Sequence, residues 1–286
     1  MKKLFFTFIL VISFCFSAIR AQDSITFTKK GTGQPLIFLP ALGCNGAVWD
    51  NTVNELSKKY TCYEVSIAGF GGVPLKGSFK IEKISKDLMD LIKNENLQKP
   101  VLIGHSFSGF LALKTAAENP DVFSKLIIVD SFPFALASIY PSVTEAQAKQ
   151  QGEMLKDYIL KESDSDYEKS QRTSFGNTIA DKDAAAKVIK WVLASDRSAI
   201  AEATSRAIST DLRDEISKIK CETLVIGTWK GKEKIGFTES NVVEKFKEQY
   251  KNLENIKIVI AGNSKHFIML DDPDWFNKTI TGFISE

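Results

Sequence analysis

The chain has 286 residues, of which 37 are Lys or Arg and 35 are Asp or Glu, so its formal net charge is +2. This near-neutral balance lacks the surplus of basic residues that binding to nucleic acid or to an anionic membrane requires, so neither partner is expected. Hydrophobic residues make up 44% of the sequence. That content, at this length, suits one large α/β domain with a buried core.

Residues 1–21 have the pattern of a secretory signal peptide. Two lysines precede an apolar run over residues 4–16, and Ala21 supplies a small residue at a cleavage position. The run is too short to span a bilayer comfortably. Cleavage after Ala21 leaves 34 basic against 35 acidic residues. We therefore expect an exported protein, periplasmic or secreted, whose mature part is residues 22–286 and has no stable membrane insertion.

The cysteines leave some alternatives open. A lipid anchor at Cys15 is disfavoured because Phe14 stands where such a cleavage needs a small residue, and an uncleaved N-terminal anchor is a further alternative. Cys44, Cys62 and Cys221 are an odd number in an oxidising compartment, so at least one is a free thiol or pairs outside the chain.

Patterns of strand and helix alternate through the first half of the mature chain. Alternating apolar and polar residues at 25–28, followed by a turn rich in Gly, predict a hairpin that leads into a buried strand at 36–39. Hydrophobic periodicity then predicts, in order, helix 49–60, strand 62–67, a glycine-rich loop at 68–74, helix 81–95, strand 101–103, helix 107–118 and strand 126–129.

The alternation stops between residue 131 and about residue 206, where the periodicity is helical only. It resumes with strand 223–226, helix 239–250, strand 256–260 and a last helix after Pro273. This order predicts an α/β fold with a doubly wound, mostly parallel eight-stranded sheet and helices on both faces. Ligands of such sheets bind at the carboxyl ends of the strands, so we predict a helical cap there, inserted at approximately residues 132–206.

The segment GHSFSG at residues 104–109 lies between a predicted strand and a predicted helix. A nucleophilic serine needs a sharp, strained strand-to-helix turn that exposes its hydroxyl, with small residues two positions before and two after it. Gly104 and Ser108 meet this need, although Ser108 stands where glycine is usual. We therefore predict that Ser106 is a nucleophile.

These landmarks make the chain resemble the α/β-hydrolase fold family over nearly all of its mature length. The matching segments occur in the family's order: LIFLPALG at 36–43, AGFG at 68–71, the Ser106 turn, TLVIG at 223–227 and HFIMLDDP at 266–273. The resemblance implies a serine hydrolase with a helical cap.

Two histidines are candidates for the general base. His105 precedes the nucleophile on the strand side, where its side chain should point away from Ser106, and we interpret it as structural. His266 follows the final strand, where the family places its base, and could take the Ser106 proton. Asp271 and Asp272 follow His266 too closely to orient it and are expected to cap the next helix. With so few histidines, a catalytic zinc site is implausible, and we expect no cofactor.

The oxyanion hole is expected to combine the backbone amides of Phe107 and Leu42, with Ala41 the next candidate. The family's usual His-Gly in this loop is replaced by Pro40-Ala41, which backbone donors tolerate. Cys44 lies in the same loop and is expected to line the pocket rather than to act as a second nucleophile.

The sequence leaves open which carboxylate, if any, orients His266 as the acid of a Ser-His-acid catalytic triad. The resemblance predicts an aspartate a few residues beyond strand 223–226, but the chain has GTWKGKE at 227–233. Asp130 ends the strand after the nucleophile's helix, a position that some family members use, and is the favoured candidate. Glu233 could reach the histidine if its loop folds back, although its flanking lysines indicate a solvated segment. The third alternative is that no carboxylate orients the base.

We expect an exported serine hydrolase that cleaves a small ester, thioester, lactone or amide through an acyl-serine intermediate. Its partner would be a small-molecule acyl substrate. One alternative, motivated by the uncertain acid, is a non-catalytic or weakly active binding protein that kept the fold. A second is a cofactor-free perhydrolase or C–C bond hydrolase.

Overall fold

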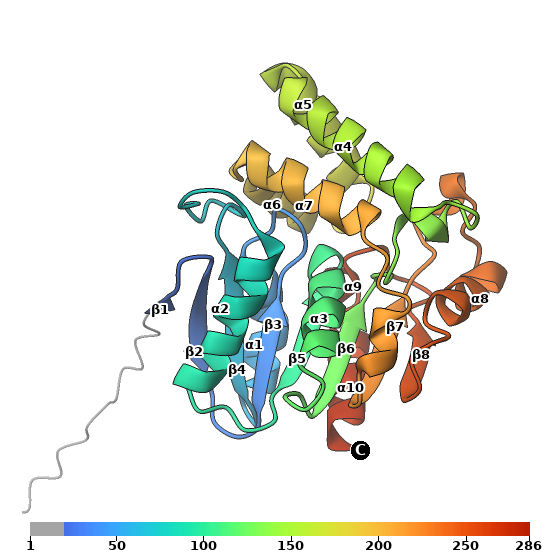
Figure 1. Ribbon diagram of the computed structural model, residues 1–286. Helices are drawn as coiled ribbons and strands as arrows, with labels where there is room; N and C mark the ends of the chain where they lie inside the picture. Colours follow the sequence, from blue (N-terminus) through green and yellow to red (C-terminus); the bar gives the residue numbers. More distant parts are fainter. Residues whose placement is uncertain (1–19) are drawn as a thin grey trace, which may run out of the picture.

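The computed structural model describes residues 20–286, and the predicted signal peptide therefore lies outside the described residues except for its last two. The described part contains eight strands (Figure 1), which are β1 (Arg20–Ala21), β2 (Ile25–Lys30), β3 (Pro35–Leu39), β4 (Thr61–Ile67), β5 (Val101–His105), β6 (Lys125–Val129), β7 (Glu222–Gly227) and β8 (Ile256–Ile260).

These strands form one sheet in the order β1-β2-β4-β3-β5-β6-β7-β8. Strand β2 pairs antiparallel with β1 and β4, and every pair from β4 to β8 is parallel. The expected count of eight is reached only with β1, a two-residue strand within the predicted signal peptide, so the body of the sheet has seven strands.

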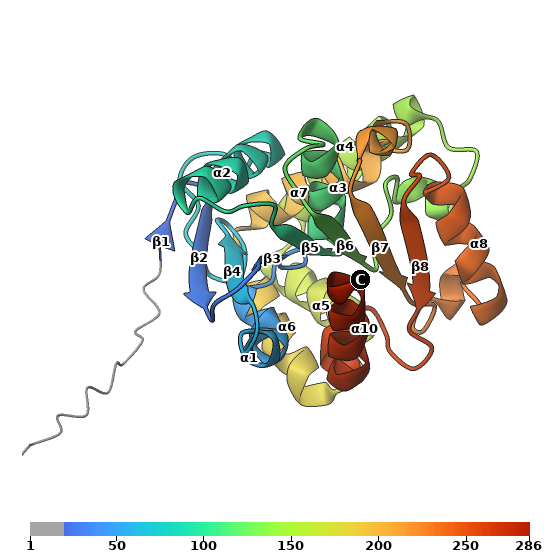
Figure 2. The same ribbon diagram turned by 90° about the horizontal axis from the view of Figure 1, so that it is seen from below.

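Helices cover both faces of the sheet because the strands are apolar on both sides. The helices are α1 (Asp50–Leu56), α2 (Ile81–Asn94), α3 (Phe107–Glu118), α8 (Glu239–Gln249), α9 (Ile268–Asp271) and α10 (Pro273–Ser285), with short 3-10 helices η1 (Gly46–Trp49), η2 (Leu136–Ser138), η3 (Glu215–Lys218) and η4 (Glu233–Ile235). Figure 2 shows α2 and α3 on one face and α1 and α10 on the other.

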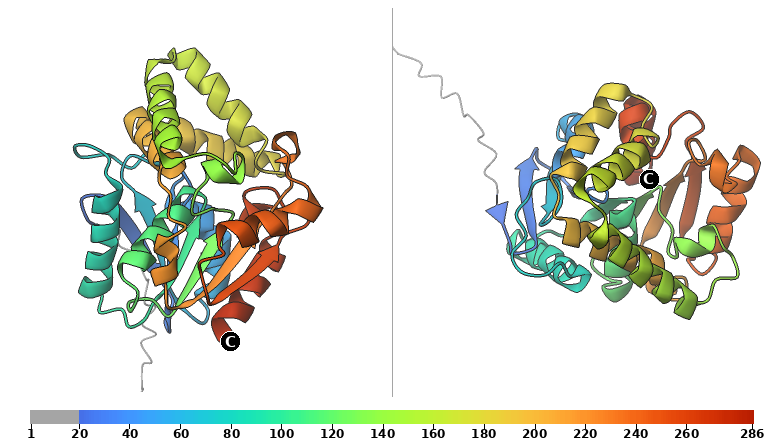
Figure 3. Two further views of the ribbon diagram at one scale, coloured as in Figure 1. Left: turned by 45° about the vertical axis from the view of Figure 1, so that its right-hand side comes forward. Right: turned by 90° about the horizontal axis from the view of Figure 1, so that it is seen from above.

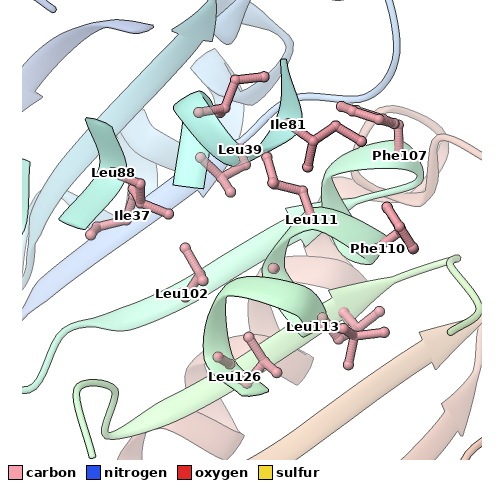
Figure 4. Close-up of a cluster of buried hydrophobic side chains, with 14 of the residues drawn as sticks. Ile37, Leu39, Ile81, Leu88, Leu102, Phe107, Phe110, Leu111, Leu113 and Leu126 are labelled. Atoms are coloured by element: carbon pink, nitrogen blue, oxygen red, sulfur yellow. The ribbon is translucent and has the colours of Figure 1, made fainter. Parts of the chain in front are cut away.

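The core is divided by the sheet into two clusters, and successive residues of one strand contribute to opposite clusters. In β5, Leu102 packs with α2 and α3, as Figure 4 shows, whereas Val101 and Ile103 pack on the side of α1 and α10. All three side chains are fully buried. Strand β5, which leads into the Ser106 turn, is therefore fixed from both faces.

Between β6 and β7 the chain forms four long helices, α4 (Glu145–Lys161), α5 (Asp164–Gly176), α6 (Lys182–Leu193) and α7 (Arg197–Ser209). At the start of each helix, a capping side chain accepts a hydrogen bond from a backbone N–H of the first turn. The capping residues are, in order, Thr144, Ser163, Asp181 and Asp196. Figures 1 and 3 show these helices at one end of the sheet, beyond the carboxyl ends of the parallel strands.

The helical layer packs directly on the loops at that end. A Cβ atom added to Gly43 would lie 3.1 Å from side-chain carbons of Val192 and Ile200, and one added to Gly69 would lie 2.7 Å from Cβ of Ala199. The helices thus contact the loops that follow β3 and β4. The expectation that residues 132–206 act as a cap over a binding site stays a prediction.

No helix among residues 20–286 combines the length and the apolar character that a membrane span needs.

Candidate active site

The sharp turn at Ser106 joins the end of β5 to the start of α3. Ser106 has φ 56° and ψ −121°, a conformation that non-glycine residues rarely adopt and that occurs at functional sites. Its N–H donates to the carbonyl of Val129 at 2.9 Å, which ties the turn to the end of β6. A Cβ atom on Gly104 would lie 2.2 Å from the carbonyl oxygen of Ser108, so this turn requires glycine there.

Ser108, the departure from the usual glycine, is fully buried and makes a specific contact. Its hydroxyl donates to the carbonyl oxygen of Pro40 in the loop after β3. A glycine could not make this bond. The serine therefore fastens the nucleophile turn to the loop that carries Leu42.

His266 and Asp130 meet at the end of the sheet. The distance from His266 Nδ1 to Asp130 Oδ2 is 2.5 Å. A carboxylate only accepts hydrogen bonds, so Nδ1 carries the proton and donates it, and Nε2 of the neutral ring keeps its lone pair. The Asp130 side chain is fully buried, whereas the His266 side chain is 20% exposed. The ring is thus held from the inside and open toward solvent.

Asp130 has an unusual backbone conformation and strong electrostatic support. Its φ is 44°, in the left-handed region that Asp tolerates better than most residues, and its N–H donates to the carbonyl of Ile226 at 2.7 Å. Burial alone would raise the pKa of the Asp130 carboxyl. The ammonium of Lys232 and the hydrogen bond from His266 outweigh burial and hold that pKa well below its usual value. Asp130 is therefore an anion throughout the neutral range.

Lys232 is the residue at this site that the sequence did not reveal. Its Nζ lies 2.6 Å from Oδ1 and 2.6 Å from Oδ2 of Asp130, and its side chain is 19% exposed. The sequence indicates a solvated segment for the lysines that flank Glu233, and this prediction is wrong for Lys232. Glu233, in contrast, is exposed, and the carboxylate that contacts the His266 ring is that of Asp130. The structure thus brings His266 together with Asp130.

The two aspartates after His266 act on backbone amides. Asp272 accepts from the N–H of Trp275 and caps α10. Asp271 instead accepts from the N–H groups of Lys265 and Ala180, both at 2.8 Å, so the expectation that it caps α10 is wrong. Asp271 fastens the segment before His266 to the helical layer.

His105 is hydrogen-bonded to the backbone of His266. Its Nε2 lies 2.9 Å from the carbonyl oxygen of His266, and because a carbonyl only accepts, Nε2 carries the proton. Complete burial lowers the pKa of His105 well below its usual value, so the ring stays neutral. The two imidazole centroids are 4.6 Å apart. Since His105 precedes Ser106, this contact places His266 beside the nucleophile turn.

The amides of Phe107 and Leu42 lie on the two segments that Ser108 connects. Phe107 is the first residue of α3, and such a residue has no intrahelical acceptor for its N–H. Within residues 20–286, the Leu42 amide has no backbone partner. The loop also contacts the helical layer, because the hydroxyl oxygen of Ser195 lies 3.1 Å from the carbonyl oxygen of Gly43 and 3.0 Å from that of Trp191, within reach of a hydrogen bond to either.

Cys44 belongs to the core below this loop. Its side chain is fully buried among apolar residues, and burial raises the pKa of its thiol far above the usual value. It therefore does not line a pocket, contrary to expectation, and its protonated thiol is a poor nucleophile. Cys62 is likewise buried, and its thiol pKa is raised to about 12.

Comparison with known proteins identifies the class to which this fold and site belong. The model of the alpha/beta hydrolase family matches residues 36–279, and the chain belongs to this family.

Two curated relatives are pimeloyl-[acyl-carrier protein] methyl ester esterases. The one from Aliivibrio fischeri is 31% identical over 38% of this chain and 41% of its own length, and the one from Aliivibrio salmonicida is 30% identical over 47% and 50%. The chain thus spans half or less of the length of these two relatives. Among solved structures, an esterase from Exiguobacterium antarcticum matches with a TM-score of 0.75 and 18% identity, covering 94% of this chain and 98% of the other, which is a likeness of fold.

Proposed function

We propose that the protein is a serine hydrolase that cleaves a small carboxylic ester, with thioesters, lactones and amides as further members of its substrate class. The observation that carries the proposal is the hydrogen-bonded pair of His266 and Asp130 beside the strained Ser106 turn. A buried carboxylate that orients a histidine next to an activated serine is the arrangement of nucleophilic acyl transfer.

The proposed reaction has two halves. The Ser106 hydroxyl oxygen attacks the substrate carbonyl carbon while Nε2 of His266 takes the hydroxyl proton, and collapse of the tetrahedral intermediate expels the alcohol, which receives that proton. Water then attacks the acyl-serine, with His266 again taking and returning one proton. The carboxylic acid leaves and Ser106 is restored, so the net reaction consumes one water.

Asp130 and two backbone amides complete the proposed machinery. Asp130 accepts the Nδ1 proton, which keeps Nε2 free as the base and stabilises the imidazolium that forms. The amides of Phe107 and Leu42 would donate to the carbonyl oxygen as it becomes negative. Each such donor contributes about 3 kcal/mol of transition-state stabilisation in comparable enzymes.

Ester hydrolysis is favoured within this substrate class by the curated relatives, which are named as methyl ester esterases. It is tested by the turnover of nitrophenyl acetate and nitrophenyl butyrate by the wild type, Ser106→Ala and, as a control, Ser142→Ala on the exposed surface. We expect turnover in the wild type and the control and its loss in Ser106→Ala. Equal turnover by all three proteins would sink the proposal, and a non-catalytic binding protein would turn over neither ester.

We also propose that the protein is exported, with a mature chain that begins at Gln22. Support comes from the charged and apolar segments of residues 1–21 and from the anchoring of the chain directly after the proposed cut. The N–H and hydroxyl of Ser24 both donate to Asp87 Oδ2, at 2.8 and 2.6 Å. Cleavage would thus leave a short N-terminus fixed to α2.

A further inference from the structure

Lys232 competes with His266 for the same carboxylate. Its ammonium lies at 2.6 Å from each oxygen of Asp130, while the ring of His266 reaches only Oδ2. Nζ also donates to the carbonyl of Thr228 at 3.2 Å and lies 5.3 Å from the ring centroid of Phe237. The lysine is therefore held in place by the end of β7 and by the residues after η4.

The charge of this lysine has a direct consequence for the base. A carboxylate that faces one imidazole favours the protonated ring, because opposite charges attract. A second cation in contact with both carboxylate oxygens neutralises most of that attraction, and in a buried site the effect is strong because water screens little. The same two contacts fix the rotation of the carboxylate, so that Oδ2 faces Nδ1.

The other charged or titratable groups around the pair are accounted for by contacts of their own. His105 is neutral and donates to the His266 carbonyl, and the hydroxyl of Tyr250, directly after α8, donates to the carbonyl of Ser131 at 2.8 Å. On the neighbouring loops, Asp271 accepts from backbone amides and Lys265 Nζ donates to the carbonyl of Ile179. Lys230 lies over the ring of Trp229, and Glu233 is exposed. Within the described residues, Lys232 is the lysine or arginine that contacts Asp130.

We propose that Lys232 is a positioning residue that locks the Asp130 carboxylate toward His266 and, by sharing its charge, keeps the His266 ring unprotonated at more acidic pH than Asp130 alone would allow. This inference rests on the proposed function for its consequence in catalysis. The expected consequence is that activity extends to lower pH than it would if the same aspartate faced His266 without Lys232.

The first test is the pH profile of kcat/KM for nitrophenyl acetate in the wild type, Lys232→Gln, Lys232→Met and Lys232→Arg. We expect the acidic limb of the profile to move upward by about one pH unit, or tenfold in proton concentration, in the two uncharged variants. Lys232→Arg retains the charge and should leave the limb near its wild-type position. Lys230→Met removes a neighbouring charge without touching Asp130 and should also leave it in place.

A loss of kcat in the uncharged variants with an unmoved acidic limb would overturn the proposal, because it would indicate a purely structural role. An equal shift in Lys230→Met would also overturn it, because any nearby cation would then suffice. Lys232→Gln keeps a hydrogen-bond donor, so it provides the measurement if Lys232→Met does not fold.

The second test needs no activity. The chain has two histidines, so the imidazole resonances can be followed by NMR during a pH titration of Ser106→Ala and of Ser106→Ala with Lys232→Gln. The His266 resonances should titrate at higher pH in the double variant, while those of buried His105 should not respond. An unchanged titration midpoint of the His266 resonances would refute the role of Lys232, even if the wild type is an active enzyme. A shifted midpoint in a protein without turnover would refute the proposed esterase activity and leave the role of Lys232 standing.

Discussion

At the scale of single residues, the proposed chemistry depends on the hydrogen bond that His266 donates to Asp130. In Asp130→Asn an amide replaces the carboxylate, and its NH₂ group can favour the wrong tautomer of His266. We expect kcat to fall by about 10² to 10⁴, measured with a nitrophenyl ester. Glu233→Gln changes an exposed carboxylate in the loop after β7 and should retain wild-type kcat. Full activity in Asp130→Asn would show that the acid is elsewhere.

The same substitution should also destabilise the fold. Lys232 would lose the partner of its partly buried ammonium, and removing one member of a buried ion pair costs about 3–5 kcal/mol. We expect a lower urea midpoint for Asp130→Asn and a smaller loss for Asp130→Asn combined with Lys232→Met, because the double change leaves no unpaired cation. Equal losses in the single and double variants would contradict this coupling.

At this scale the sequence predicted residues whose role is local. The GHSFSG turn pointed to Ser106 because a strand precedes it and a helix follows. Asp130 remained one of three alternatives for the acid, since its role depends on whether the loop after β8 brings His266 to it. Lys232 was missed for the same reason: only the folded loop after β7 brings its ammonium to a residue about a hundred positions earlier.

At the scale of elements, Ser108 links α3 to the loop after β3. We expect Ser108→Ala to lower kcat by about tenfold to a hundredfold with little change in KM, because the Leu42 amide would lose its fixed place and small displacements are costly in catalysis. Ser85→Ala serves as the control, since it removes another buried bond between hydroxyl groups, which joins Ser85 of α2 to Thr115 in the later part of α3 at 2.8 Å. An equal loss of kcat in both variants would contradict this role for Ser108.

The elements themselves were largely predictable. Periodicity located α2 and α3 to within a residue, since their apolar residues recur at helical spacing and Asn119-Pro120 ends the second. Helix 49–60 was overestimated, because the chain forms a 3-10 turn at Gly46–Trp49 and α1 ends at Leu56. The packing of Ala199 on Gly69 could not be foreseen, because periodicity does not tell which face of a helix meets which loop.

At the scale of the whole molecule, export makes a prediction about the mature chain. Expressed with its own N-terminus in a bacterium that secretes through signal peptides, the protein should appear outside the cytoplasm with the mass of residues 22–286. Replacing Ala21 with Arg should block cleavage and leave a larger, membrane-associated form. An uncleaved cytoplasmic wild type would contradict the proposal. A lipid-anchored form beginning at Cys15 would do so as well.

The overall architecture followed from the sequence because strand and helix patterns alternate and then give way to helices alone. That order predicts a doubly wound sheet, and the observed strand order agrees with it. What the pattern could not supply is which residues of the helical layer meet which loops, such as the contact of Ser195 with Gly43.

Whether Ser106 is the nucleophile is tested most directly by covalent labelling with a fluorophosphonate, followed by peptide mass spectrometry. We expect one adduct per chain, on Ser106, formed rapidly in the wild type, slowly in Asp130→Asn, and not at all in Ser106→Ala. A wild type that takes no label, or a label on a serine other than Ser106, would contradict it.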